Sequence, residues 1–333
     1  MSIHELAFAK QSARGTPATA AAFRIPLVGG TVKPRRQVDL LEETGISRLR
    51  TQAYVFQVGA EGNPEYAARP TALGLLLFGL LGAKAVAGGA DPFTHTFNET
   101  AEQPYMTFWR QLENLKYEKF VDCRITQMVL TSEAGRPLRA AMTVAGLDPR
   151  HLASGTYGTE VAVAEESGAP FMHYDGAGAL KVENVVIGSI ERIVTTINNN
   201  NTFQQGDSHR GYDVSEGMLD LMFEVVTLIE DVAEYNRFHY GSATPSDGAL
   251  ATKDVVELAT TYLDFLWTRV AAAPGPERSL RIQSGNRVQI TAVEGYEPNT
   301  NNDPIKKTSS YRSLRPTSGT GIVATLKNGQ ASY

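Results

Sequence analysis

The sequence predicts a mainly β protein with a sandwich or barrel architecture, one or two flanking helices, an extended N-terminal arm and long loops. Two observations predict it: many short runs rich in aromatic and β-branched residues, and period-two alternation of apolar and polar side chains. A third is that strands and helices do not alternate as they would in a parallel α/β sheet. With 333 residues the chain is long enough for one large all-β domain or two ordinary ones.

The first half of the chain begins with residues 1–22, which are rich in Ala, Ser, Thr and Gly and predict an extended arm in front of a domain over 23–333. Ala53–Val58 has the composition of a strand. Pro70 precedes the apolar segment Leu73–Leu81, as expected for the first turn of a helix. This run falls short of the roughly 20 residues of a membrane span.

Strands then dominate. Pro92–Asn98 and Pro104–Leu112 are short aromatic runs, and alternation over 121–144 around a Gly-Arg-Pro break predicts a hairpin. Residues 146–180 show no clear period and predict a long loop or an insertion. The segments that follow are again strand-like, at 180–197, 260–270, 279–284, 287–293 and 321–326, with a polar loop over 297–308.

Two segments of the second half have an unusual composition or fit more than one secondary structure. Asn198–Asn201 is a run of four asparagines, which predicts a strand end or tight turn. Met218–Ile229 also fits one face of a helix, but its β-rich composition and Gly217 favour a strand. Asp231–Tyr240 predicts one short helix.

Composition and motifs argue against an enzyme. The net charge of −5 gives no basic surface for gripping phosphates, and Cys123 is the single cysteine, which fits synthesis in a reducing cytoplasm. The six histidines are scattered singly, so no metal site is predicted. Gly319–Ala324 loosely matches a dinucleotide fingerprint, but too few residues follow for the helix and strand that a cofactor site requires. We therefore predict no catalytic residue, metal or cofactor.

An acidic stretch without Lys or Arg extends from Asp213 to Glu234. If residues 215–225 form a strand, its side chains alternate between two faces. The apolar face would carry Leu219, Leu221, Phe223 and Val225, and the other face Glu216, Asp220 and Glu224. Three interpretations stay open: a solvated sheet face, a pair of catalytic carboxylates as in glycosidases, or an acidic channel lining that repels DNA.

A family resemblance emerges over Val182–Tyr240. A strand runs into the asparagine run, Arg210–Gly217 supplies a glycine-marked turn, and a long strand precedes the acidic turn and Tyr235–Phe238. This order of elements resembles the tail tube proteins of long-tailed bacteriophages. Gly15–Ala18 and Glu65–Gly82 resemble the same family's arm and following helix.

The resemblance implies a structural virion protein that self-assembles into stacked hexameric rings and forms a conduit for DNA ejection. It implies the tape measure, tail terminator and tail tip proteins as further partners, and DNA that passes through without specific binding. Glu216, Asp220 and Glu224 are then candidate lumen-facing residues. Alternatives are another tail component, such as a terminator or a secretion-type tube, and a carbohydrate-binding β-sandwich.

Overall fold

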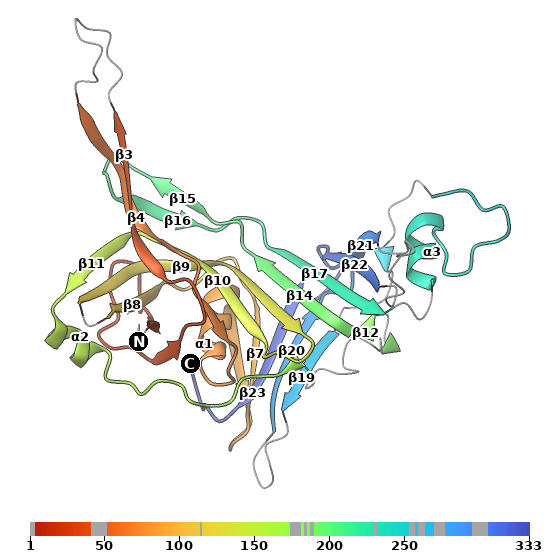
Figure 1. The fold of residues 1–333 in the computed structure, drawn as a ribbon, viewed down its shortest axis with the longest axis horizontal. Helices are drawn as coiled ribbons and strands as arrows, with labels where there is room; N and C mark the ends of the chain where they lie inside the picture. Colours follow the sequence, from red (N-terminus) through yellow and green to blue (C-terminus); the bar gives the residue numbers. More distant parts are fainter. Residues whose placement is uncertain are drawn as a thin grey trace, which may run out of the picture.

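Two antiparallel β-sheets packed face to face, with helix α1 between them, form the body of the chain in the computed structural model (Figure 1). The structure describes residues 4–40, 52–113, 115–173, 181–182, 185–186, 190–228, 232–252, 257–258, 264–269, 277–294 and 306–333. Among these residues the chain is mainly strand with three short helices, which confirms the predicted mainly β fold. The helices are α1 (Leu73–Leu81), α2 (Ser154–Glu160) and α3 (Ala233–Tyr240).

The large sheet runs along the length of the molecule. Its main path, in order, is β18 (Glu257–Leu258), β21 (Val288–Glu294), β22 (Lys306–Ser313), β17 (Asp220–Leu228), β14 (Ile190–Asn198), β9 (Lys116–Glu133), β10 (Arg139–Gly146), β4 (Ala53–Gly62) and β3 (Val32–Leu40). Five further strands join it beside this path: β1 (His4–Lys10), β2 (Phe23–Pro26), β5 (Glu65–Ala67), β8 (Met106–Leu112) and β11 (Asp148–Leu152).

The second sheet covers one face of the first. Its order is β13 (Val185–Val186), β12 (Lys181–Val182), β19 (Asp264–Arg269), β20 (Arg278–Ser284), β23 (Ile322–Asn328), β7 (Phe93–Glu99) and β6 (Gly82–Ala87). Phe223 of the large sheet stacks on Phe265 of the second at 5.3 Å between ring centroids, so the core lies between the sheets. A separate hairpin pairs β15 (Thr202–Gln205) with β16 (Gly211–Ser215).

Most predicted elements are confirmed, including the hairpin of β9 and β10, helix α1 and helix α3. The strand predicted over Met218–Ile229 is confirmed for Asp220–Leu228: β17 buries Leu221, Phe223 and Val225 on one face. None of the helices in the described part of the chain is long and apolar enough to cross a membrane.

The prediction of an extended arm over residues 1–22 is wrong for residues 4–10. These residues form β1, which pairs with β2 on one side and β8 on the other. Leu6 and Phe8 are fully buried, and Phe8 packs against Phe108 at 6.0 Å between centroids. The apolar alternation of β1 therefore places it in the core.

The prediction of a loop over 146–180 is wrong for residues 148–160. Asp148–Leu152 is β11, paired with β9, and α2 follows it. Residues 161–173 run back over the body as a strap, in which Phe171 is fully buried and its amide donates to the Ala68 carbonyl at 3.0 Å. Residues 174–180 lie outside the described residues, as do 297–305 of the predicted polar loop.

Both ends of helix α1 are satisfied by side chains from distant segments. Its N-cap, Ala72, has no capping side chain. Instead the Glu166 carboxylate from the strap accepts the Thr71 amide at 2.8 Å and the Ala72 amide at 3.2 Å. Burial raises the pKa of Glu166, and these backbone hydrogen bonds partly offset the rise. At the other end, Asn199 donates to the Leu80 carbonyl at 2.9 Å.

Gly74 of α1 is in contact with Tyr333. A Cβ atom at Gly74 would lie 2.1 Å from the Tyr333 ring, whose hydroxyl donates to the Thr71 carbonyl at 2.7 Å. Gly74→Ala should therefore expel the ring and lower the free energy of unfolding by roughly 1–3 kcal/mol, despite alanine's better helix propensity.

A double-mutant cycle by chemical denaturation checks this. Gly74→Ala in a Tyr333→Ala background should cost little, because the clash is already gone. Gly89→Ala, where a Cβ meets nothing within 4 Å, is the control. Additive costs for Gly74→Ala and Tyr333→Ala would contradict the packing described.

His95 predicts a pH dependence of stability. The ring is fully buried against Tyr333, and its Nε2 bonds the Gln330 carbonyl at 2.7 Å. Burial lowers the pKa of His95, and the hydrogen bond to Gln330 offsets this only in part. The unfolded chain thus binds more protons, so stability is lost as pH falls below about 6.5. The free energy of unfolding, measured from pH 7 to 5, should fall less steeply with pH for His95→Gln than for wild type. An unchanged slope would show that His95 is not the source of the pH dependence.

Candidate functional site

Among the described residues, no element covers one face of the large sheet along β9, β14, β17 and β22. Side chains alternate on these strands, so one set is buried against the second sheet and the other points to solvent. The strand registers bring the outward set together. We call this surface the open face; its residues are Gln127, Val129, Thr131, Glu133, Arg192, Val194, Thr196, Asn198, Asp220, Met222, Glu224, Val226, Thr308, Ser310 and Arg312, and Glu133 pairs with Arg136 at 3.0 Å.

The charged side chains on β14, β17 and β22 in the open face form two ion pairs. Arg312 Nη2 lies 2.5 Å from Asp220 Oδ1, and its Nε lies 3.2 Å from the same oxygen. Arg192 pairs with Glu224. Each pair joins neighbouring strands diagonally, because Met222 is opposite Arg312 and Val226 is opposite Arg192 in the register. The carboxylates of this surface are therefore charge-balanced.

Glu216 does not belong to the open face. It follows β16, before β17 begins, and its carboxylate lies 2.7 Å from Arg124 Nη1. Arg124 is only 5% exposed, donates to the Val214 carbonyl and stacks 4.2 Å over the ring of Tyr105. The structure thus brings Asp220 and Glu224 to one surface and makes Glu216 the counter-ion of a buried arginine.

The open face is hollowed at one place. A depression of about 380 Å³ lies over β14, β17 and β22, with Thr196, Met222 and Ser310 among its walls. Among the described residues no three His, Cys, Asp or Glu side chains are grouped to hold a metal ion.

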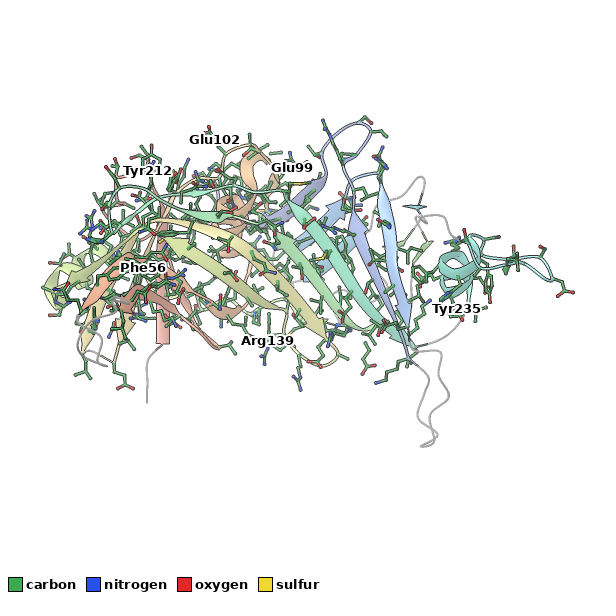
Figure 2. All side chains as sticks on the ribbon, turned by 90° about the horizontal axis from the view of Figure 1, so that it is seen from above. Phe56, Glu99, Glu102, Arg139, Tyr212 and Tyr235 are labelled. Atoms are coloured by element: carbon green, nitrogen blue, oxygen red, sulfur yellow. The ribbon has the colours of Figure 1, made fainter. Side chains whose placement is uncertain are left out.

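A long hairpin of β3 and β4 projects from one end of the molecule (Figure 1). It carries exposed apolar side chains, namely Val38, Leu40, Tyr54 and Phe56. The hairpin of β15 and β16 lies beside it, since Gln205 donates to the Phe56 carbonyl and the Val58 amide donates to the His209 carbonyl at 2.7 Å. Figure 2 shows Phe56 and Tyr212 at this end and Tyr235 at the other.

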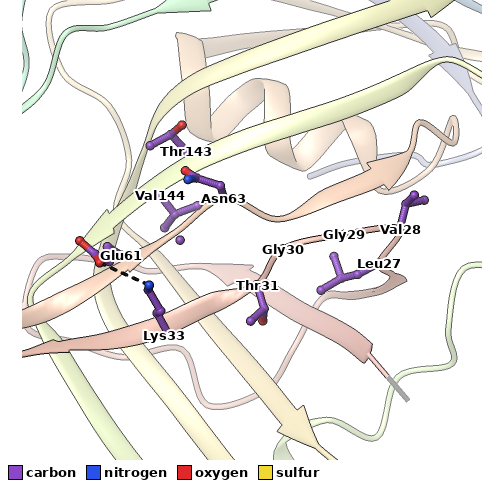
Figure 3. Close-up of a pocket in the computed structure, with 11 residues that line it drawn as sticks. Leu27, Val28, Gly29, Gly30, Thr31, Lys33, Glu61, Asn63, Thr143 and Val144 are labelled. Carbon is purple, nitrogen blue, oxygen red and sulfur yellow. Dashed lines mark ion pairs between the residues drawn. The ribbon is translucent and has the colours of Figure 1, made fainter. Parts of the chain in front are cut away.

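A groove of about 830 Å³ lies at the base of this hairpin (Figure 3). Its floor is the backbone around Gly29 and Gly30, and Lys33 and Glu61 form an ion pair of 3.7 Å at its rim. Gly30 has a φ of 63°, and a Cβ there would lie 1.8 Å from the Asn63 carbonyl oxygen. The close approach of two chain segments under the hairpin therefore requires glycine.

Comparison with protein families decides the assignment. A family model described as phage tail tube protein matches residues 2–298. This chain belongs to the phage tail tube protein family. A comparison with curated proteins finds no match. The match confirms the resemblance drawn from the order of elements over 182–240, and extends it to nearly the whole chain.

The tail tube protein also contains an anchor that its sequence does not reveal. Glu234 of α3 accepts hydrogen bonds from Tyr311 at 2.6 Å and Ser309 at 3.0 Å, and pairs with Lys307 at 2.7 Å. Burial, and then the Glu234 charge, raises the pKa of Tyr311 well above its usual value, so its hydroxyl remains a donor. These four buried groups fasten α3 to β22.

The asparagine run was predicted as a strand end or a tight loop, and β14 does end at Asn198, with Asn200 at a φ of 48°. The asparagines on either side bond to distant segments. Asn199 is buried, and Asn201 donates to the Gln103 side chain at 2.7 Å. Gln103 in turn donates to the Leu80 carbonyl at 2.7 Å. No sequence pattern links these positions, because their partners lie about 100 residues away.

The two kinds of acidic residue should respond differently to neutralisation. Glu216→Gln should lower the free energy of unfolding by about 1–3 kcal/mol, because Arg124 loses its counter-ion in a buried setting. Glu224→Gln should change it by less than about 1 kcal/mol, because the Arg192 pair is exposed. Denaturant titrations of both variants give the comparison. Equal costs would contradict the distinction between the buried and the exposed pair.

Proposed function

We propose that this tail tube protein assembles into stacked hexameric rings, with the open face lining a lumen through which DNA leaves the virion. The observation that carries the proposal is the open face itself: a broad sheet surface of small, mostly uncharged side chains with no covering element in the described part of the chain. Surfaces of this breadth are normally packed against another layer. The wall of a channel for a moving polymer must instead stay uncovered.

The two ends of the large sheet support closure into a ring. Among the described residues, β3 at one end pairs only with β4, and at the other end β21 is covered by β18 over two residues. Strand edges of this kind invite pairing with another chain. Edges at opposite ends of one sheet make head-to-tail contacts, which close into a ring when the rotation per subunit fits. The hexameric number is taken from the family.

The hairpin of β3 and β4 supports stacking of rings. Its apolar residues would be poorly solvated on an isolated subunit, and its projection away from the sheet places them where a second ring could cover them. We propose this hairpin as a contact between rings. The tape measure, tail terminator and tail tip proteins remain proposed partners, and the protein is proposed to have no catalytic role.

The carbohydrate-binding alternative gains no support from this surface. Sugar sites present aromatic side chains for stacking, and the named residues of the open face include none. Its carboxylates are also engaged by arginines rather than free to act as an acid and a base.

Electron microscopy of the purified protein should show rings that stack into hollow tubes, and cysteine labelling should locate the open face within them. Cys123 is fully buried, so single cysteines introduced elsewhere can be labelled selectively. Met222→Cys on the open face should react with a bulky polyethylene-glycol maleimide before assembly and be protected in the tube.

Ala85→Cys, exposed on β6 of the second sheet, is the matched control and should react in both states. Equal reaction of Met222→Cys before and after assembly would place the open face outside the lumen. Protein that stays monomeric under all conditions would refute ring formation.

A further inference from the structure

The arginines of the open face are in the position where a DNA backbone would bind most readily. Arginine forms paired hydrogen bonds with phosphate, and each phosphate neutralised on DNA releases counterions. Arg192 and Arg312 have side chains that are 43% and 47% exposed, so a polymer moving along this face can reach them. Left unpaired, both would slow its passage.

Strand β17 supplies a carboxylate to each of these arginines. It lies between β14 and β22, with Glu224 directed to Arg192 on one side and Asp220 to Arg312 on the other. Asp220 engages both the Nε and the Nη2 of Arg312, the two nitrogens that would otherwise bind a phosphate as a pair. The side chains between the pairs are uncharged: Val194, Thr196, Met222 and Ser310.

We infer that Asp220 and Glu224 mask Arg192 and Arg312, and so keep DNA from adhering to the wall of the lumen. The inference rests on the proposed function, and it changes the expected role of these acids. They do not form a negative lining; they cancel positive charges that the sheet already carries. An exposed pair of this kind adds only about 0–1 kcal/mol to stability, so masking explains the pairs better than folding does.

Masking does not require strong pairs. A phosphate that displaces a carboxylate from its arginine stays within reach of the carboxylate's charge, which repels it. The local charge that DNA meets is therefore near zero, whichever arrangement holds at a given moment. Removing the carboxylate leaves a full positive charge at each site.

The test is DNA binding by the unassembled protein, in which the open face is accessible. The variant Asp220→Asn/Glu224→Gln keeps side-chain size and frees both arginines. Fluorescence anisotropy with a short labelled DNA duplex should show tighter binding than wild type at low salt. Two added phosphate contacts should steepen the slope of log affinity against log salt by roughly 1.8. When salt is lowered from 200 to 50 mM, the affinity of the variant should therefore rise about ten-fold more than that of wild type.

A matched control carries the same change in net charge on other surfaces. Asp91→Asn/Glu277→Gln frees Arg278 and Lys327, whose pairs lie at the second sheet. It should gain less affinity for DNA than the open-face variant, because the Arg278 side chain is only 22% exposed, whereas those of Arg192 and Arg312 are 43% and 47% exposed. Adding Arg192→Gln and Arg312→Gln to the open-face variant should return binding to the wild-type level.

Equal binding by the open-face variant and wild type, or equal gain by the control, would overturn masking. The binding measurement does not depend on where the open face lies in the tube, whereas the cysteine labelling does. A masked face that proves to lie outside the lumen would therefore overturn the proposed function alone. In virions, the open-face variant should form normal tubes and release DNA more slowly, and release at the wild-type rate would overturn the role in passage.

Discussion

The arrangement of the large sheet depends on strand β9, which belongs to both its buried part and its open face. This strand is 18 residues long and changes partners just after Asp122, a residue with a φ of 54° whose carboxylate accepts the Gly15 amide at 2.7 Å. Up to Cys123, β9 pairs with β8 and β11, and from Arg124 onward it pairs with β10 and then β14. Burial is continuous over Glu118–Ile125 and alternates from Gln127 onward. One half of the strand is thus covered on both sides, and the other half begins the open face.

The predictable parts of the fold are those whose signal is local. Alternation in β17 and the apolar run of α1 each specify an element without help from distant residues. β22 is different: Lys-Lys-Thr-Ser-Ser-Tyr-Arg-Ser contains one apolar residue, Tyr311. It is a central strand because Glu234 satisfies Lys307, Ser309 and Tyr311 from a helix that is remote in sequence. No period in residues 306–313 could indicate that burial, and a polar loop was predicted up to Thr308.

The outward position of Asp220 and Glu224 could be predicted from the sequence, but the position of Glu216 and the charge balance of the surface could not. The alternation of residues 220–228 correctly separates the buried side chains from Asp220 and Glu224. The excess of acidic residues over 213–234 suggested a negative surface, because the sequence shows no basic residue nearby. The arginines come from other strands, 32 residues before Glu224 and 92 residues after Asp220. Charge balance on a sheet is set by strand order, which the local sequence does not contain.

Ion pairs in this tail tube protein fall into two groups with different physical consequences. Glu234 with Lys307, and Glu216 with Arg124, are largely removed from water, so each leaves an unsatisfied charge if one partner is lost. Such pairs fix how α3 and the β16–β17 connection sit on the body. The pairs of the open face are hydrated, and their loss would hardly alter the fold. Under the proposed function, they determine the charge that passing DNA encounters. The wall of the proposed conduit therefore depends on interactions too weak to matter for folding, because its requirement is a surface to which nothing adheres.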